Sequence, residues 1–360
     1  MVCFGARLVT LWSQDREPIL IDWVTASIPC FHTGKINDGQ VVSITPEGEV
    51  AWQTEKRKSV AGSHDARISV RARTATHIEL EGNPAKWLQG HNLFGSDDLL
   101  GLVQATMERL VPMLRLTPMD EDIEAWQTGT YRLTRVDCTG MWELPRRGDV
   151  RAWLRAAELQ SKSRHGRPVT TGGTLYFGKN SRRWSLKFYA KGDELEAKEK
   201  GHRLPETIPH RDKLIKWADN KLRGEVTLRG MQLEKLGRLD VASHWHAELP
   251  MKLLFEHIET LQMAEQFTLT PALLEGLPGR LIAVYKLWYE GEDLRTMYSR
   301  ATFYRYRAEL LKHGIDINVR QPPKAENVIP LVRVLRPEAI AQVPAWAIGT
   351  PLYFDPRKTA

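Results

Sequence analysis

Hydrophobic and polar residues alternate along several short stretches of the chain, a pattern typical of half-buried β-strands. The clearest stretch is Trp184 to Tyr189 (WSLKFY). Successive strand side chains point to opposite faces, so its apolar residues can face a core while Lys187 and Tyr189 point the other way. The β-branched and aromatic stretch Thr174 to Phe177 precedes it, and the intervening GKNSRR supplies turn residues. Together they predict a β-hairpin.

The same composition and alternation predict strands along most of the first two thirds of the chain. These lie at Ile19–Cys30, Val41–Ile44, Val50–Gln53, Ile68–Arg73, Thr76–Leu80, Tyr131–Thr139 and Lys221–Arg229. In two of them the outward positions carry charge: Arg135 and Asp137 in the one, Arg223 and Glu225 in the other. Charged residues at alternate positions indicate a polar sheet face opposite the core.

Helical spacing appears between the strands and again near the C-terminal end. Apolar residues from Leu99 to Leu110 recur at helical intervals, and Arg147–Gln160 is a second predicted helix. Its arginines Arg147, Arg151 and Arg155 recur every four residues and predict one positive stripe that contacts phosphates.

The segment from Asp293 to Gly314 has the spacing of two short helices joined by a turn. Ser299 can cap the second helix and Gly314 can end it. Within the second helix, Phe303, Tyr306 and Leu310 form an apolar stripe. Arg300, Thr302 and Arg305 are among the side chains that point away from this stripe. A short helix, a turn and a basic second helix predict a helix-turn-helix DNA reader, and the alternative is a pair of packed structural helices.

Composition and charge are compatible with these predicted elements, and they limit the class of protein and its compartment. The 360 residues suffice for two domains, and 42% hydrophobic with 26% charged residues describes a globular chain. A net charge of +7 permits a polyanionic partner without requiring one. Three scattered cysteines exclude a disulfide framework. No apolar run approaches the roughly 18 residues of a membrane span, so a cytoplasmic protein with no membrane partner is expected.

Three predicted strands each direct one reactive group to the polar face: Asp137, Tyr189 and Glu225. If the strands are neighbours, two carboxylates stand beside one phenol, and oxygen ligands of this kind favour Mg²⁺ or Mn²⁺. A free tyrosine has a pKa of about 10 and is a poor nucleophile at neutral pH. A bound cation can assist it by polarising a phosphodiester and orienting it for in-line attack. The alternative is that Asp137 pairs with Arg135 or Arg229 in an ordinary surface salt bridge.

Several motifs, taken in order, resemble one family. They are NPAKWLQGHNLFGSDDL (83–99), TRVD (134–137), LKFYAKGDEL (186–195), LRGEVTL (222–228), ATFYRYRAELLKHGI (301–315) and ENVIPLVRVL (326–335). The chain resembles the rolling-circle replication initiators of filamentous phages, the gene II protein family, from about residue 19 to 350. It also resembles, more distantly, the tyrosine-dependent initiators of rolling-circle plasmids.

The resemblance implies a site-specific nickase and strand transferase. Such initiators cut the plus strand of double-stranded origin DNA through a tyrosine that becomes linked to the 5′ phosphate, and they later rejoin the displaced single strand. The nucleophile falls on Tyr189, with Lys191 placed to stabilise charge on the phosphate. Asp137 and Glu225 fall on the family's acidic positions. Residues assigned to DNA contact by motif or by strand face are Gln89, His91, Asn92, Arg135 and Lys187.

The chain departs from the wider superfamily in its metal ligands. Many members use a His-hydrophobic-His strand, but His244-Trp245-His246 follows the tyrosine instead of preceding it. Glu79, in the stretch THIELEG, is the better third ligand beside Asp137 and Glu225. The role of His91 stays open between a metal ligand, a phosphate contact and a hydrogen bond that braces its loop.

The expectation is therefore an α+β fold with a central antiparallel sheet flanked by helices. An extension (1–18) precedes the endonuclease domain (19–245), and a helical DNA-binding domain follows (246–360). With no P-loop pattern, strand separation needs a host helicase, and a host replicative polymerase extends the primer in the bacterial cytoplasm. The rival hypotheses are a non-catalytic DNA-binding repressor or packaging factor, and a plasmid initiator or mobilisation relaxase.

Overall fold

A computed structural model describes most of the chain. The described residues are 19–164, 166–197, 203–263, 267–268, 277–289, 292–313, 315–318, 328–329 and 334–358. One sheet of nine strands dominates it, in the order β4-β5-β6-β1-β7-β12-β11-β10-β9. Every neighbouring pair is antiparallel. The predicted central antiparallel sheet is confirmed.

For seven of the nine strands the bounds follow the predicted stretches to within a few residues, whereas β4 and β9 were not predicted from the sequence. The bounds are β1 Ile19–Pro29, β4 Lys58–Ala61, β5 Arg67–Thr74, β6 His77–Gly82, β7 Arg132–Glu143, β9 Val169–Thr171, β10 Thr174–Phe177, β11 Trp184–Ala190 and β12 Lys221–Arg229. Four two-residue strands form two small pairs, β8 Ser161–Lys162 with β13 Gln262–Met263 and β14 Phe267–Thr268 with β15 Val328–Ile329.

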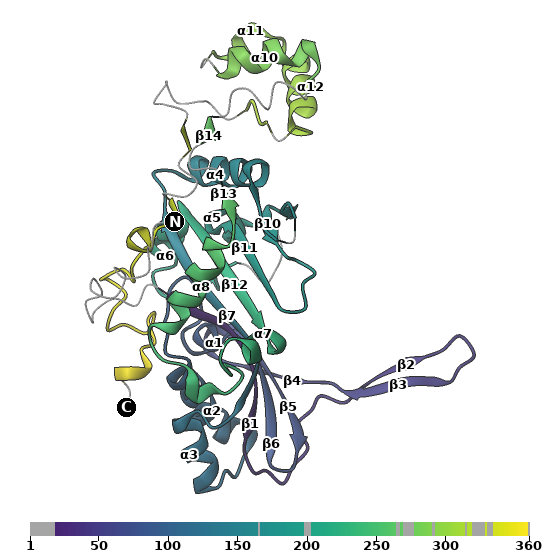
Figure 1. The fold of residues 1–360 in the computed structure, drawn as a ribbon, viewed down its shortest axis with the longest axis vertical. Coiled ribbons are helices and arrows are strands. Elements are labelled where there is room, and N and C mark those ends of the chain that lie inside the picture. The colour runs from purple at the N-terminus through teal and green to yellow at the C-terminus, as the bar shows by residue number, and fades with distance from the viewer. Residues whose placement is uncertain are drawn as a thin grey trace, which may run out of the picture.

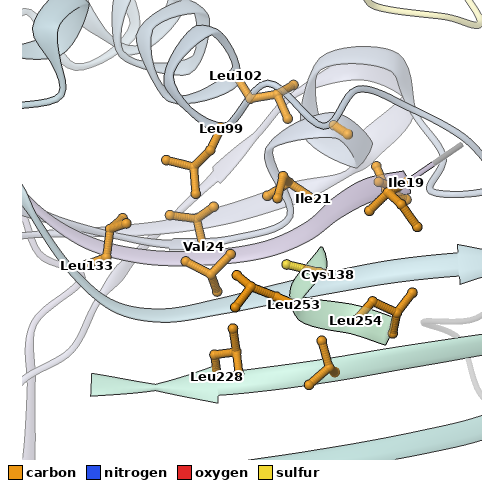
Figure 2. Close-up of a cluster of buried hydrophobic side chains, with 14 of the residues drawn as sticks. Ile19, Ile21, Val24, Leu99, Leu102, Leu133, Cys138, Leu228, Leu253 and Leu254 are labelled. Atoms are coloured by element: carbon orange, nitrogen blue, oxygen red, sulfur yellow. The ribbon is translucent and has the colours of Figure 1, made fainter. Parts of the chain in front are cut away.

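One face of the sheet carries the main hydrophobic core. Helices that contribute to it are α1 Pro84–Gln89, α2 Leu99–Leu114, α3 Asp120–Thr128, α4 Arg147–Gln160, α7 Gly230–Lys235 and α8 Leu249–Glu259. Figure 2 shows part of this core, in which Leu99 of α2 lies beside Val24 of β1 and Leu253 of α8 lies beside Cys138 of β7. This contiguous apolar cluster fixes the strands whose opposite face forms the candidate site.

A second, smaller cluster forms beside the other face of the sheet. It joins Leu93 and Phe94 with α5 (Lys191–Glu196), α6 (Arg211–Ala218) and, from the C-terminal segment 334–358, Ala347 and Leu352. Helix α6 was not predicted from the sequence, and neither was α3.

The C-terminal helices form a unit with a core of its own. Helices α10 (Gly279–Tyr289), α11 (Leu294–Met297) and α12 (Arg300–Leu311) enclose buried side chains such as Phe303 and Leu310. They lie beyond α4 in Figure 1. The Ser299 hydroxyl accepts a hydrogen bond from the Thr302 amide, so the predicted cap is confirmed. The predicted stop at Gly314 lies outside the described residues.

The chain enters this helical unit later than residue 246 and leaves it before the C-terminus. Helix α8 packs in the main core, and so do Leu335 and Ile340 after the helical unit. The Ala341 amide donates to the Met141 carbonyl of β7 at 2.7 Å. The apolar contacts therefore assign α8 and the segment 334–358 to the sheet, whereas the buried core of the helical unit is formed by described residues between Leu277 and Ile317.

A two-stranded arm projects from the sheet in Figure 1. It consists of β2 (Gln40–Ile44) and β3 (Val50–Glu55), which the sequence predicted as strands. Its exposed apolar side chains include Ile44 and Trp52. No helix in the described part of the chain is long and apolar enough to cross a membrane.

Candidate active site

Strands β7, β12 and β11 are neighbours, so the three predicted reactive groups come to one face of the sheet. Tyr189 lies opposite Arg223, and Lys187 lies opposite Glu225. Asp137 lies opposite Thr227 on the other side of β12. The alternation of strand side chains places this set opposite the apolar residues that face the main core. The predicted convergence of Asp137, Tyr189 and Glu225 is what the structure shows.

This sheet face carries polar residues, as the sequence predicted, but it is buried. Tyr189 is 7% exposed, Glu225 2%, Asp137 1% and Arg223 not at all. The reason is that the loop after α1 folds over this end of the sheet: the Arg223 guanidinium donates to the Asn92 carbonyl. Such charges are stable in a buried place only when they are paired, and pairing organises this site.

Arg223 forms a buried ion pair with Asp22, a residue that sequence reasoning missed. Its Nη2 lies 2.7 Å from Asp22 Oδ2. Asp22 Oδ1 also accepts hydrogen bonds from the side-chain amides of Asn83, at 2.5 Å, and Asn92, at 3.0 Å. Burial opposes the charge of Asp22, but Arg223 and the nearby lysines outweigh it and hold its pKa well below the ordinary value. The signal in the sequence was a single carboxylate inside an apolar strand, ILIDWV.

Three cations surround the ring of Tyr189. Lys187 Nζ lies 5.8 Å from the ring centroid, Lys191 Nζ 5.9 Å and Arg223 Cζ 6.0 Å. Burial nevertheless raises the pKa of the Tyr189 phenol well above its ordinary value, and Arg223 opposes that rise. The phenol is therefore protonated in this state, and the Arg223 guanidinium is already in place to stabilise negative charge that develops on its oxygen.

Lys191 follows Tyr189 by two residues and is held in place by two partners. Its ammonium group donates to Asn92 Oδ1 at 3.2 Å and pairs with Glu194. Burial lowers the pKa of Lys191, Glu194 raises it and Arg223 lowers it further. The side chain is only 2% exposed, so its charge is fixed beside the tyrosine and is not free to move in solvent.

Glu225 and Asp137 are each bound to a basic residue. Lys187 Nζ lies 2.5 Å from Glu225 Oε1, whereas Glu225 Oε2 has no hydrogen-bond partner in the described part of the chain. Burial raises the pKa of Glu225 to about 8; the carboxylates of Asp22 and Asp137 also raise it, and Lys187 opposes them. Arg135 binds both oxygens of Asp137, at 2.8 and 2.6 Å, so the salt bridge considered from the sequence does form.

Glu79 does not join these carboxylates, contrary to the predicted ligand set. It lies on β6, which β1 and β7 separate from β12 in the sheet. Its oxygens pair with Arg57, with Arg71 at 3.0 Å and with Arg73 at 3.6 Å. Within the described ranges, no group of three or more His, Cys, Asp or Glu side chains is arranged to hold a metal ion, and this includes His244 and His246.

The predicted DNA contacts of the loop after α1 are directed inward. Gln89 is 2% exposed and donates to the carbonyls of His91, at 3.1 Å, and Phe94, at 2.6 Å. His91 is 1% exposed, its Nδ1 accepts from the Leu93 amide at 3.2 Å, and burial lowers its pKa to about 3. Of the three roles considered for His91, these contacts favour bracing of the loop. Asn92 links Asp22, Lys191 and Arg223, so its role is also internal.

The predicted positive stripe on α4 is largely neutralised. Arg147 hydrogen-bonds to Asp193, Glu196 and Asp219, and Arg151 hydrogen-bonds to both oxygens of Asp193. Asp193 and Glu196 belong to α5, and Asp219 follows directly after α6; the sequence pattern could not place these residues next to α4. The pairing leaves the two arginines with little charge to offer a phosphate.

The basic residues of α12 remain at the surface, as predicted. Arg300 and Arg305 are exposed and Thr302 is partly exposed, whereas Phe303 and Leu310 are buried in the helical unit. The predicted division of this helix into an apolar stripe and a basic surface is confirmed. An exposed basic helix after a short helix and a turn is the arrangement that helix-turn-helix proteins use to contact DNA.

Comparison with known proteins identifies matching families over both parts of the chain. Residues 20–248 match the N-terminal family of the phage replication-associated protein known as the gene II protein, and residues 279–350 match its C-terminal family. The replication-associated gene II protein of Enterobacteria phage I2-2 is 44% identical over 323 residues, which cover 88% of this chain and 93% of that protein.

A solved structure also shows a distant likeness. The rolling circle replication initiator protein from Geobacillus stearothermophilus aligns with 72% of this chain and 91% of its own, at 15% identity and a TM-score of 0.32. A likeness this weak supports no inference about function.

Proposed function

Because the chain belongs to the family of replication-associated gene II proteins of phages, we propose that it initiates rolling-circle replication by nicking the plus strand of the origin through Tyr189. The observation that carries the proposal is the ring of Tyr189 among three fixed cations, Lys187, Lys191 and Arg223. A phenol in that position can attack a phosphodiester, because the charge of the transition state meets positive groups that are already oriented.

In the proposed reaction the Tyr189 oxygen forms a bond to phosphorus as the bond to the 3′ oxygen breaks. The phenol gives up its proton, and the departing 3′ oxygen takes one to become the primer hydroxyl. Lys191 and Arg223 stabilise the charge on the phosphate oxygens; the Arg223 Nε, which has no hydrogen-bond partner in the described structure, is a donor available for this. The phosphotyrosine keeps the energy of the broken bond, so the reverse attack by a 3′ hydroxyl rejoins the displaced strand.

A divalent cation, Mg²⁺ or Mn²⁺, is part of the proposal, and the residues around Glu225 fit it. Glu225 Oε2 is a buried oxygen without a hydrogen-bond partner in the described chain, and Asp22 and Asp137 are electrostatically close to it. Hard cations prefer such oxygen donors. Glu225 and Asp137 would hold the ion, which must compete with Lys187 and Arg135 for them. When bound, it would supply positive charge to the scissile phosphate.

The helical unit is proposed to bind duplex origin DNA. Arg300, Thr302 and Arg305 lie on the accessible side of α12 and fit contacts with a DNA groove and its phosphates. Arg135 and Lys187 are tied to Asp137 and Glu225, so their contact with DNA requires that these pairs open. Strand separation and extension are assigned to a host helicase and polymerase in the bacterial cytoplasm.

The test uses a supercoiled plasmid that carries the cognate origin. The wild type should produce nicked circles and a covalent protein–DNA adduct, and Tyr189→Phe should produce neither while it still binds the origin. Tyr176→Phe is the matched control, because Tyr176 lies on the adjacent strand β10 opposite Lys187; it should retain both products. Nicking and adduct formation by Tyr189→Phe would refute the proposal, and origin binding without any nicking by the wild type would favour a repressor.

A further inference from the structure

A groove of about 770 Å³ opens at the end of the sheet nearest Tyr189. The start of α4 forms one side and α6 the other, with the first residues of β12 between them and Trp346 of the C-terminal segment at its margin. Its volume is within the roughly 300–1,000 Å³ of pockets that enclose small organic ligands. It can therefore hold a few unpaired nucleotides, whereas a duplex is too large for it.

The groove continues the surface on which the candidate active site lies. Lys221, which lines the groove, and Arg223, which lies opposite Tyr189, are two residues apart on one strand and so share a face. Two strand residues span about 7 Å. Helix α5, which begins two residues after Tyr189, also meets the groove: Arg147 in its wall bonds to Asp193. A strand that leaves Tyr189 in this direction enters the groove directly.

The charges that stay available in the groove are mainly positive. Of its three acidic residues, Glu143 pairs with Lys221 at 2.9 Å and Asp219 with Arg147 at 3.3 Å, which leaves the exposed Asp212. Lys213 and Lys216 are exposed on α6, and neither forms an ion pair with another described residue.

Two tryptophans add an aromatic element to this basic groove. Trp217 and Trp346 both line it and are partly exposed, and both pack edgewise with Phe94, at ring distances of 5.4 and 6.1 Å. The neighbouring Phe94 fixes their orientation. Lysines that follow a backbone, together with rigid aromatic rings on which bases can stack, are the features by which proteins hold single-stranded nucleic acid without reading its sequence.

We propose that this groove binds the unpaired nucleotides next to the scissile phosphate. Lys213 and Lys216 contact the backbone, and Trp346 stacks with a base. The inference rests on the proposed nicking function and adds to it the path of the single strand. It also gives α6 and the C-terminal segment a role in holding DNA.

The experiment measures binding of a fluorescent ten-nucleotide oligo-dT to the full chain carrying Tyr189→Phe, so that cleavage cannot trap the DNA. Adding Lys213→Ala and Lys216→Ala should weaken binding on the order of tenfold at 0.1 M salt and reduce the salt slope by about 1.4. Lys235→Ala with Lys252→Ala is the matched control, since both lysines are exposed elsewhere; it should change neither quantity. Affinity for duplex origin DNA should be unchanged in all variants.

A second pair of variants tests stacking separately from charge. Trp346→Phe should keep most of the oligo-dT affinity because an aromatic ring remains, whereas Trp346→Leu should lose on the order of fivefold or more. Equal oligo-dT binding by the groove variants and the control would overturn the inference, and so would an equal loss of duplex binding. Neither result would affect the proposed function, which the Tyr189 adduct tests independently.

Discussion

Within the described chain, the two regions proposed to contact DNA differ in whether their charged side chains are buried and paired or exposed and unpaired. Around Tyr189, Arg223, Lys191 and Glu225 are buried, and each has a partner of opposite charge. On α12, Arg300 and Arg305 are exposed, and neither forms an ion pair with another described residue. The first region has its charges fixed before DNA arrives, whereas the second offers mobile charges to whatever approaches.

The difference teaches what each region can contribute. Fixed, buried charges suit a transition state, because they need no reorganisation when the phosphate reacts. Exposed charges suit binding affinity, because the salt ions condensed on DNA are released when lysines and arginines neutralise its phosphates. Substitutions should therefore affect folding and chemistry in the first region, and salt-dependent binding in the second.

The largest expected effect comes from breaking the Asp22–Arg223 pair. Asp22→Asn or Arg223→Met leaves a buried charge without its partner, which costs about 3–5 kcal/mol of folding stability. Chemical denaturation should show this loss, and nicking should fall with it. The double variant Asp22→Leu, Arg223→Met removes both charges and should recover most of the stability but none of the activity. If it recovers nicking as well, the pair is structural only.

The same pair predicts how stability depends on pH. The folded-state pKa of Asp22 lies below its ordinary value of 3.8, so its contribution is present above pH 3.8 and is lost as the pH falls further. The stability difference between the wild type and Asp22→Asn should therefore shrink as the pH drops from about 5 to 2. A difference that stays constant across this range would contradict the ion pair.

An intermediate effect is expected from two carboxylates that differ in how fully they are paired. Mg²⁺ or Mn²⁺ should raise the melting temperature of the wild type, because an ion that binds only the folded state stabilises it. Glu225→Gln should abolish this rise. Glu79→Gln should preserve it, because Arg57, Arg71 and Arg73 already occupy Glu79. A rise that depends on Glu79 and not on Glu225 would contradict the proposed site and place the ion at Glu79.

The smallest effect on folding should come from α12. Arg300→Ala and Arg305→Ala should leave the melting temperature within about 1 °C, since exposed residues contribute little to stability. Each should weaken binding to duplex origin DNA and reduce its salt slope by about 0.9. Mobility-shift titrations at several salt concentrations measure both. A slope that does not change would mean that α12 packs but does not bind DNA.

The strands of this fold follow from the sequence better than its site does. Alternation within β7, β11 and β12 located Asp137, Tyr189 and Glu225 on one face, because that periodicity is local. The residues that cover this face are not local: Asn92 reaches Lys191 and Arg223 across about a hundred residues or more. Local pattern therefore left Arg147 and Arg151 free for DNA, and it could not show that three arginines pair with Glu79. Only Asp22 had a local signal, a carboxylate within an apolar strand.

The proposed reaction depends most on which residue attacks the phosphate. The direct measurement is to react the protein with an origin oligonucleotide, digest the adduct with trypsin and nuclease, and locate the nucleotide by mass spectrometry. Tyr189 lies in the tryptic peptide Phe188–Lys191, whereas Tyr176 lies in His165–Lys179, because trypsin does not cut between Arg167 and Pro168. We predict a nucleotide on Tyr189 in the former peptide. A nucleotide on Tyr176 or on any other residue would contradict the account.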